Sequence, residues 1–425
     1  MKVLPIGGRV YHFLRRQLKA PWARFATVTD PRDRRGQRWS LSPLLHTILA
    51  GILAGVKTLR QLEAQSLDLQ LPGFASLRRR LPDTTVYELL GRLAPDELLG
   101  TLVAQVRTLW RSKLLAPMGL PCGVIAIDGK SLGALDHDAD GWGQRHTRDH
   151  DGSPYWLVRA LRAVLTSAVG RPALWQLPIP PHTNEMGCFV AMFDALRTYY
   201  DALFEVITVD AGMTSKAHAA YVQAADKGYV MAVKDSQPEL LRELQRVLLP
   251  QTDAAPVAHS DWERHKGHSV QRRLYRTVEL AGLPGWESLR QGWLVRTVHR
   301  ADDGTEQHED RYFISNVPVG RLSPSQILGV VRGHWGIEND CNWTLDMVLR
   351  EDDTPMCTQG SATLTLGVLR LLAYNLLQLA RRKHLRPPSP KPGRNGPQRS
   401  WREVLRAFEQ ALTRSWKEAR LSPVT

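Results

Sequence analysis

Two short apolar runs in the chain each end in an aspartate with a glycine close behind it. Gly123–Asp128 reads GVIAID and is followed by Gly129, whereas Phe204–Val209 reads FEVITV and is followed by Asp210 and then Gly212. In open α/β sheets, ligands bind in the crevice beyond the carboxyl ends of the strands. A carboxylate there can hold a cation while the small neighbour lets the ligand approach. For either aspartate alone, the plain alternative is an Asp-Gly turn after a strand.

A third group of acidic residues lies in the segment Gly333–Asp353, GHWGIENDCNWTLDMVLREDD. Glu338, Asn342 and Asp346 follow one another at intervals of four, so a helix would present them along one stripe. The pattern does not choose a ligand among the acidic residues Glu338, Asp340, Asp346, Glu351 and Asp352. A solvated helix face is the alternative for most of them. Three carboxylates from two strands and a helix would suit a pair of Mg²⁺ ions, which prefer oxygen ligands and promote in-line displacement at phosphorus.

Two further acidic motifs do not fit the sites they resemble. DGKS at Asp128–Ser131 would belong to a phosphate-binding loop only with a glycine at position 124, which is Val124. DHDADG at Asp136–Gly141 opens like a calcium-binding loop, but the twelfth position is Thr147 instead of the required Glu. We therefore exclude the first and expect residues 136–151 to form a solvated loop.

The basic residues favour a polyanionic partner. The net charge is +14, and 44 of the 56 basic residues are Arg, whose guanidinium binds phosphate through two hydrogen bonds. Codon bias in a GC-rich genome would give the same excess, so charge alone does not establish nucleic-acid binding. The basic, turn-rich segment Asp30–Arg38, DPRDRRGQR, is either a phosphate-contacting arm or a solvated loop.

Membrane insertion and a disulfide framework are not expected. The longest apolar run, Leu44–Val56, is 13 residues long, whereas a bilayer span needs about 20. The N-terminus lacks the features of a secretory signal, so we expect a cytoplasmic, nucleoid-associated protein. The cysteines have no paired spacing, and we interpret them as reduced, mostly buried residues without zinc. They are Cys122, Cys188, Cys341 and Cys357.

The elements before residue 116 are predicted to be helical. Apolar residues recur at intervals of three and four after Ser40, which is placed to cap the first of these helices. Further helical patterns cover Thr85–Leu93 and Asp96–Trp110. Residues 1–115 are therefore a helical N-terminal region and our candidate for recognition of DNA ends.

The middle of the chain alternates between short strands and helices. Tyr229–Val233 is a third apolar run, and helical patterns cover Phe189–Tyr200 and Lys216–Asp226. This alternation predicts an α/β sheet with some parallel pairing. Residues 268–316 instead alternate polar and apolar positions around the turn ADDG, which predicts an antiparallel β-rich insertion.

The C-terminal third returns to helices. SPSQ at Ser323–Gln326 has capping-box spacing with Pro at the first helical position. We expect a long helix from there toward Leu349, kinked near Gly333 and Gly336. The remaining elements are predicted as a helix over Ala362–Arg382, a Pro-rich linker over 386–400 and a basic helix over Trp401–Lys417.

With these motifs in order, the chain resembles the H-repeat-associated (ISAs-type) insertion-sequence transposases of the DDE superfamily. The matching segments, which span most of the chain, are DPRDRRGQRWSLSPLLHTILAGILAGVKTLRQLEA (30–64), AIDGKSL (126–132), Asn184 with Glu185, TVDAGMTSK (208–216), YVMAVKDSQPEL (229–240), DRYFISN (310–316), RGHWGIEN with WTLD (332–346) and LRLLAYNLL (369–377). Each piece alone is weak evidence, whereas the ordered set is specific.

The resemblance implies a ribonuclease-H-like catalytic core, here residues 116–385, with a β-rich insertion at about 241–316 and a linker and basic tail over 386–425. It maps the acidic triad of the family onto Asp128, Asp210 and Glu338. It implies that these residues bind two Mg²⁺ or Mn²⁺ ions, which serve DNA cleavage at element ends and strand transfer to target DNA. A homodimer or larger assembly on DNA is also implied.

Residues around the triad are candidates for contacts with DNA. Lys130 and Lys234 follow predicted strands and could reach phosphate, with a solvated turn as the alternative. Arg332 and His334 shortly precede the acidic helix and are candidates to contact the scissile phosphate. Trp335 and Trp343 favour places in the core over base stacking, because most aromatic residues pack inside a fold.

Three positions differ from the family pattern. Asn342 replaces a His, Gly133 replaces an Arg, and HSVQRR at His268–Arg273 stands where the family has HGR-x-E-x-R. None of them belongs to the triad. The alternatives to an active transposase are a catalytically inactive DNA-binding relic and a stand-alone nuclease.

Overall fold

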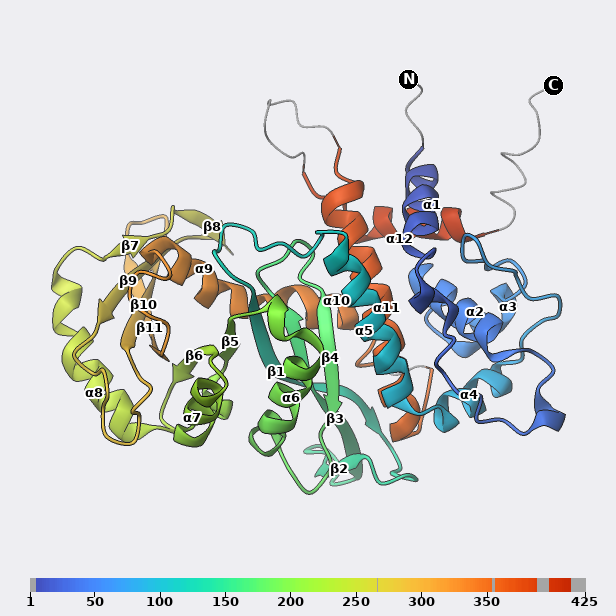
Figure 1. Ribbon diagram of the computed structural model, residues 1–425, viewed down its shortest axis with the longest axis horizontal. Coiled ribbons are helices and arrows are strands. Elements are labelled where there is room, and N and C mark those ends of the chain that lie inside the picture. Colours follow the sequence, from blue (N-terminus) through green and yellow to red (C-terminus); the bar gives the residue numbers. More distant parts are fainter. Residues whose placement is uncertain (1–4, 266, 354–355, 388–396, 414–425) are drawn as a thin grey trace.

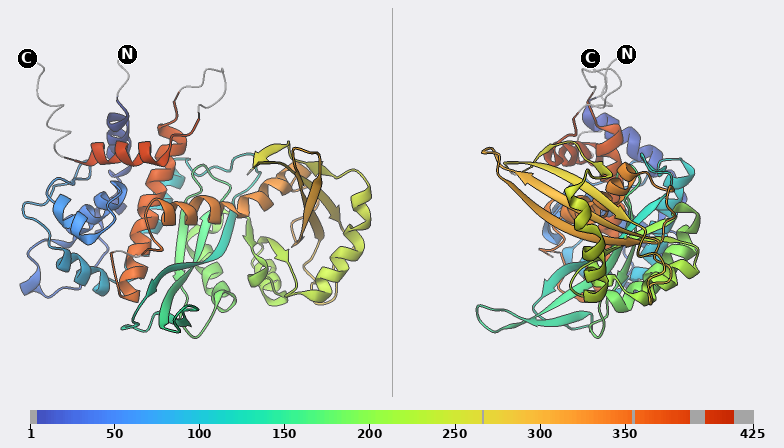
Figure 2. Two further views of the ribbon diagram at one scale, coloured as in Figure 1. Left: turned by 180° about the vertical axis from the view of Figure 1, so that it is seen from behind. Right: turned by 90° about the vertical axis from the view of Figure 1, so that its left-hand side faces the viewer.

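One large mixed sheet with helices around it forms the protein (Figures 1 and 2). The computed structural model describes residues 5–265, 267–353, 356–387 and 397–413. Within them the strand order is β2-β3-β1-β5-β6-β11-β10-β9-β7, with β4 beside β3 and β8 beside β9. The strands are β1 Val124–Leu135, β2 Gly143–Thr147, β3 Pro154–Leu165, β4 Ala173–Pro178, β5 Val206–Val209, β6 Gly228–Val233, β7 Ala258–His259, β8 Glu263–His265, β9 His268–Thr277, β10 Gln291–Arg300 and β11 Glu306–Ser315.

The centre of the sheet is parallel, as the sequence predicts. Strands β1 and β5 pair from Val124 with Val206 to Ala126 with Thr208, and β5 pairs with β6 in the same direction. Alternate side chains enter cores on opposite faces: Val124 and Val206 meet α9 (Pro324–His334), whereas their neighbours enter the larger core. Helices α6 (Glu185–Tyr200) and α7 (Lys216–Ala224) cover the face seen in Figure 1, and α9 covers the other (Figure 2).

Strand β1 is longer than the sequence predicts. It continues through DGKSLGAL to Leu135, because the antiparallel strand β3 supplies backbone partners along this length. Asp128 therefore lies inside the strand, opposite Arg162, and the prediction of a strand end or an Asp-Gly turn at this position is wrong. The parallel pairing with β5 has already ended at Ala126, so Asp128 still lies beyond the parallel part of the sheet.

The segment 136–151 is more ordered than the solvated loop that we expect from its composition. It contains β2, which pairs with β3 from Gly143 with Val158 onward. The Asp138 carboxylate accepts hydrogen bonds from the backbone N–H groups of Trp142 and Gly143. The loop thus leads into a strand of the sheet, although its tip is exposed.

The predicted β-rich insertion extends the main sheet. After α8 (Pro238–Leu248), strands β9, β10 and β11 form an antiparallel meander within the predicted interval. Strand β11 then pairs with β6, from Tyr312 with Val233 to Ser315 with Val230. The insertion therefore shares its backbone hydrogen bonds with the parallel strands.

The helical end of the molecule gathers the two ends of the chain (Figure 1). Its helices are α1 Ile6–Gln17, α2 Leu41–Leu53, α3 Leu59–Gln65, α4 Asp83–Arg92, α5 Pro95–Arg111, α11 Gly360–Leu379 and α12 Trp401–Leu412. α12 packs against α1 and α2, and α11 packs against α2, α4 and α5 as well as against the sheet. Ser40 precedes α2 as predicted but makes no capping hydrogen bond with its side chain. The sequence patterns missed α1.

Several C-terminal predictions can be compared with the described residues. The helix predicted over Ala362–Arg382 is α11 with the π-helical turn η7 (Ala380–His384). The span Gly360–His384 is long and apolar enough to cross a membrane, but its most apolar window of 18 residues is entirely buried inside the protein. Most of the predicted linker, and the end of the helix predicted over Trp401–Lys417, lie outside the described residues. All of the cysteines are buried as expected.

The predicted long helix after Ser323 is broken where a kink is expected. Ser323 and Gln326 form the capping box at the start of α9. After Trp335 the path continues as a π-helical turn, η6 (Ile337–Asn342), and then as α10 (Trp343–Met347). A side chain at Gly336 would place its Cβ 2.5 Å from a guanidinium nitrogen of Arg171, so only glycine allows this close approach.

Candidate active site

Two aspartates face the same region from neighbouring strands. Asp128 projects from β1, and its Oδ1 accepts a hydrogen bond of 2.9 Å from the Gly129 N–H. Asp210 follows β5 directly and begins the short 3-10 turn η4 (Ala211–Met213), where its Oδ1 accepts a hydrogen bond from the Met213 N–H. The Asp210 carboxylate is therefore oriented by the turn that ends its strand.

The third carboxylate comes from the break between α9 and α10. Glu338 is the second residue of η6 and is exposed. π-helical turns are rare and occur frequently at functional sites. Because α9 packs against β1 and β5, and η6 packs against β1, this break lies above the two aspartates.

The charges of these residues act on one another. The pKa of Asp128 is raised to about 7, first by burial and then by the neighbouring charges of Glu338 and Asp210, against the opposing effect of the Gly129 hydrogen bond. Like charges that disfavour ionisation of one carboxyl group must lie close to it. Asp128, Asp210 and Glu338 thus form one electrostatic group.

The structure also separates Glu338 from the other acidic residues of its segment. Asp340 is bound by Arg171 and Arg382, Asp346 by Lys130, and Glu351 by Arg162 in a fully buried ion pair. Among the described residues, Glu338 has no ion pair. Asp352 is also unpaired there, but its charge acts on Asp346. Glu338 is the member of the segment that is both unpaired and coupled to Asp128.

A fourth carboxylate, Glu185, belongs to this region, and sequence reasoning did not select it. It is the first residue of α6, after the N-cap Asn184, and its charge also raises the pKa of Asp128. The Arg159 guanidinium is hydrogen-bonded to Glu185. A Cβ at Gly129 would overlap the Glu185 carboxylate. The pair Asn184-Glu185 among the family-like motifs was the available signal.

Comparison with known proteins places this geometry in a family. A family model described as "Transposase DDE domain" matches residues 122–376, an interval that contains both aspartates and Glu338. The chain belongs to the DDE-domain transposase family. It is similar to the "H repeat-associated putative transposase YhhI" and to the "Putative protein YbfL", both of Escherichia coli (strain K12), with 23% identity over 272 residues to each. These matches cover 60% of this chain and 64% of each relative.

The two lysines predicted to reach phosphate have different surroundings. Lys130 lies within β1, and its Nζ is 2.5 Å from Asp346 Oδ2, so the alternative of a solvated turn is wrong. Lys234 follows β6 and is exposed, and no described residue forms an ion pair with its side chain. Lys234 is therefore the more available of the two for an external phosphate.

The two residues predicted to contact the scissile phosphate are held by the protein. The Arg332 guanidinium forms two hydrogen bonds of 2.6 and 2.7 Å with the Glu263 carboxylate of β8. His334 is buried, its Nδ1 lies 2.8 Å from Thr208 Oγ1, and burial lowers its pKa to about 4. His334 is therefore neutral and contacts β5, the strand that ends at Asp210. It supports this strand and does not provide a positive charge that could bind DNA phosphate.

The two tryptophans of the acidic helix lie outside the core. Trp343 is 45% exposed, so the prediction of a core position is wrong for this residue. Trp335 is partly buried, and the Arg311 guanidinium lies over its ring at 3.6 Å from the centroid. Both Trp335 and Arg311 line a cavity of about 860 Å³ between the β-rich strands and α9, which reaches Gly336 and Asn339 beside Glu338.

The donor set suits a hard divalent cation. In the part of the chain that the structure describes, no group of three or more His, Cys, Asp or Glu side chains is already arranged to hold a metal ion. The carboxylates near Asp128 nevertheless supply only oxygen atoms, as Mg²⁺ and Mn²⁺ prefer. Their mutual repulsion, visible in the raised pKa of Asp128, is the effect that a bound cation would reverse.

Proposed function

We propose that this protein is the transposase of a bacterial insertion sequence, which cleaves DNA at the element ends and transfers the strands to target DNA. The observation that carries the proposal is the group Asp128, Asp210 and Glu338. Each lacks an ion pair among the described residues of a chain with net charge +14, and two of them raise the pKa of the third. Unneutralised carboxylates that disfavour one another's ionisation are typical of a functional site, and a bound metal ion would compensate their charge.

We further propose a ribonuclease-H-like core for the part of the sheet that carries the group. Support comes from the order β3-β1-β5-β6, in which β1, β5 and β6 are parallel and β3 is antiparallel. The β-rich strands lie between Asp210 and Glu338 in sequence. The proposed division is a helical region over 1–115, a catalytic domain over 116–385 with its insertion at about 241–316, and a C-terminal segment over 386–425.

In this proposal the three carboxylates hold two Mg²⁺ ions. When bound, the ions would activate the attacking oxygen and stabilise the leaving oxygen at phosphorus. The hydrogen bond from Gly129 orients the Asp128 carboxylate, and the turn after β5 orients that of Asp210. The exposed side chain of Glu338 leaves room for DNA to approach. Lys234 and the arginines of the neighbouring cavity would contact the phosphate backbone, with Lys130 and Arg332 released from their carboxylate partners.

The position of Asn342 favours an active enzyme over an inactive relic. Asn342 is buried, and its Oδ1 lies 3.4 Å from the Arg162 guanidinium, next to the pair of Arg162 with Glu351. Asn342, where the family has a His, thus belongs to a buried polar network. None of its hydrogen bonds within the described residues involves Asp128, Asp210 or Glu338.

A cleavage assay with carboxylate variants tests the proposal. The substrate is DNA that contains the inverted repeats flanking the gene, in Mg²⁺ buffer. Asp128→Asn, Asp210→Asn and Glu338→Gln should each abolish strand cleavage and leave DNA binding unchanged, whereas Asp346→Asn, whose partner is Lys130, should be milder. Normal cleavage by Glu338→Gln together with loss in Asp346→Asn would assign the third ligand to Asp346. Cleavage by wild type without strand joining would identify a nuclease.

A further inference from the structure

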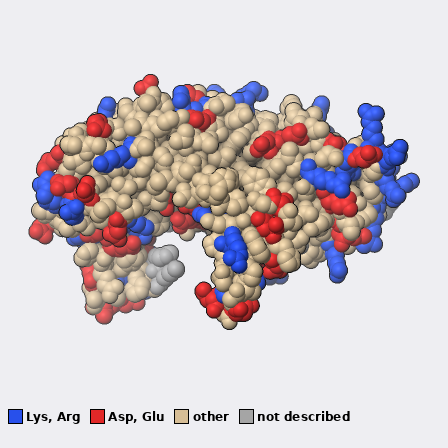
Figure 3. All heavy atoms as spheres, turned by 90° about the horizontal axis from the view of Figure 1, so that it is seen from below, with Lys and Arg blue, Asp and Glu red and all other residues tan. Residues whose placement is uncertain are grey.

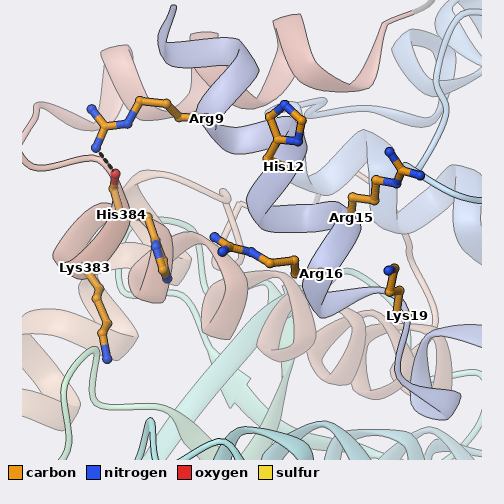
Figure 4. A pocket seen from close by; sticks show the side chains of 7 residues that line it. All are labelled: Arg9, His12, Arg15, Arg16, Lys19, Lys383 and His384. Atoms are coloured by element: carbon orange, nitrogen blue, oxygen red, sulfur yellow. Dashed lines mark hydrogen bonds between the residues drawn. The ribbon is translucent and has the colours of Figure 1, made fainter. Parts of the chain in front are cut away.

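A second basic site lies at the helical end of the molecule, and its lining residues do not include Asp128, Asp210 or Glu338. A cavity of about 760 Å³ opens between α1 and the end of η7, and Figure 4 shows side chains from both elements around it. Its lining residues are Arg9, His12, Arg15, Arg16, Lys19, Lys383 and His384. No Asp or Glu is among them.

The folding of α1 concentrates these cations on one side. Arg9, His12, Arg16 and Lys19 recur at intervals of three and four, so they follow one face of the helix and its continuation. The opposite face is apolar and buried, with Val10, Phe13 and Leu14 among its residues. The hydrophobic contacts of α1 with α12 and η7 therefore hold like charges together.

The positive charge of this cavity is not compensated within the described residues. No ion pair there includes Arg15, Arg16, Lys19 or Lys383. The Arg9 guanidinium donates a hydrogen bond to the backbone carbonyl of His384. This carbonyl is uncharged and does not neutralise the arginine. His384 packs its ring against Phe13, with ring centroids 4.8 Å apart. The pKa of His384 is lowered to about 4, first by burial and then by the positive charges of Arg16, Lys383 and Arg9.

The predicted arm at Asp30–Arg38 is less well suited to bind an anion. The Arg32 guanidinium is held by the Asp30 carboxylate and by the Trp39 carbonyl. Asp33 lies among the remaining arginines and caps the short turn η2 (Arg34–Gly36). The α1 cavity, in contrast, has five Lys and Arg side chains and no carboxylate.

We propose that the α1 cavity binds the phosphate backbone of duplex DNA, as a contact site separate from the catalytic carboxylates. Arg9 and Lys19 are ten positions apart, which corresponds to about 15 Å along a helix axis and exceeds the size of one phosphate group. Successive phosphates of one DNA strand advance by about 3.4 Å along the duplex axis, so the row of cations matches several of them. The partner follows from the proposed function, and the inference therefore rests on it.

The test is a salt titration of DNA binding with matched variants. One variant carries Arg16→Gln, Lys19→Gln and Lys383→Gln, which leaves the structural contacts of Arg9 and His384 in place. The control carries Arg145→Gln, Arg242→Gln and Arg290→Gln, three exposed cations outside this cavity and outside residues 1–115, and has the same net charge. Binding of each full-length protein to a labelled random-sequence duplex is measured in EDTA between about 50 and 200 mM salt.

The cavity variant should bind at least about tenfold more weakly at the low-salt end, and the slope of log K against log salt should become shallower by about 0.9 for each phosphate that the protein no longer neutralises. The control should keep the wild-type slope. Equal slopes in wild type and cavity variant, or equal losses of affinity in the two variants, would overturn the inference and leave the proposed function intact. Wild-type protein that binds no DNA at any salt would overturn the proposed function as well.

Discussion

Replacing Asp128 by Asn should stabilise the metal-free protein at alkaline pH. In the folded protein, burial and the charges of Glu338 and Asp210 raise the pKa of this carboxyl group from 3.8 to about 7. The folded state therefore binds a proton that the unfolded state releases between about pH 4 and pH 7. Because of this difference, the free energy of unfolding should fall as pH rises through that interval and level off above it.

The size of the effect follows from the pKa change. Each tenfold change in proton affinity corresponds to about 1.4 kcal/mol, so a pKa raised from 3.8 to about 7 gives an upper limit of roughly 4 kcal/mol. Relaxation around the charge reduces this value, and we expect Asp128→Asn to gain about 2–3 kcal/mol at pH 8. The amide oxygen of Asn can still accept the hydrogen bond from Gly129.

Urea unfolding in EDTA across this pH range measures the effect, with Asp352→Asn as the control because Asp352 is exposed and lies outside the carboxylate group. Added Mg²⁺ should stabilise wild type at alkaline pH and stabilise Asp128→Asn much less, since bound ligand favours the folded state. An Asp128→Asn variant that keeps the pH dependence of wild type, or is less stable at alkaline pH, would refute the reasoning.

Three further outcomes are expected. Glu351→Gln should lower the free energy of unfolding by about 3–5 kcal/mol in urea titrations, because it leaves the buried Arg162 without its charged partner. As a control, Glu309→Gln removes only the more exposed ion pair with Arg311 and should change this free energy by less than about 1 kcal/mol. Gly129→Ala should reduce cleavage, because the added methyl group displaces the Glu185 carboxylate. The double variant Gly129→Ala with Glu185→Ala should be more stable than Gly129→Ala alone. No gain in stability would mean that the close approach of Gly129 and Glu185 is unimportant. Cleavage should require Mg²⁺ or Mn²⁺ and fail with Ca²⁺ or chelator, and any dependence on ATP would contradict the exclusion of a phosphate-binding loop at DGKS.

The strands and helices with strong periodicity could be predicted from the sequence. The runs ending near Asp128 and Asp210 are parallel neighbours, and the capping box at Ser323 begins α9. The extension of β1 past Asp128 could not be predicted, because it depends on pairing with β3, whose residues are distant in sequence. In contrast, α1 could have been predicted, because Val10, Phe13 and Leu14 recur at helical spacing; only its packing against α12 and η7 depends on residues distant in sequence.

The candidate site was predictable in its positions but not in its electrostatics. The spacing of the acidic residues in Gly333–Asp353 did not show which of them is the metal ligand. Ion pairs with Lys130, Arg162, Arg171 and Arg382 distinguish them in three dimensions. Long-range ion pairs also decide which basic residues are available to DNA. Arg332, a predicted phosphate contact, is paired with Glu263. The basic residues of α1 form no ion pair within the described part of the chain.

Figure 3, seen from below, shows Lys and Arg side chains gathered over the helical end of the molecule on the right of that view, whereas α1, which lines the basic cavity, lies on the opposite side of this end, at the top of Figure 1. This end is assembled from segments at opposite ends of the polypeptide, since α1 packs against α12 and η7. A nascent chain that has emerged only as far as β11 already contains Arg16 and Lys19 but not Lys383. The basic cavity can therefore form only after Lys383 and His384 have been synthesised, and a product truncated before them that still carries Asp128 and Asp210 would lack it.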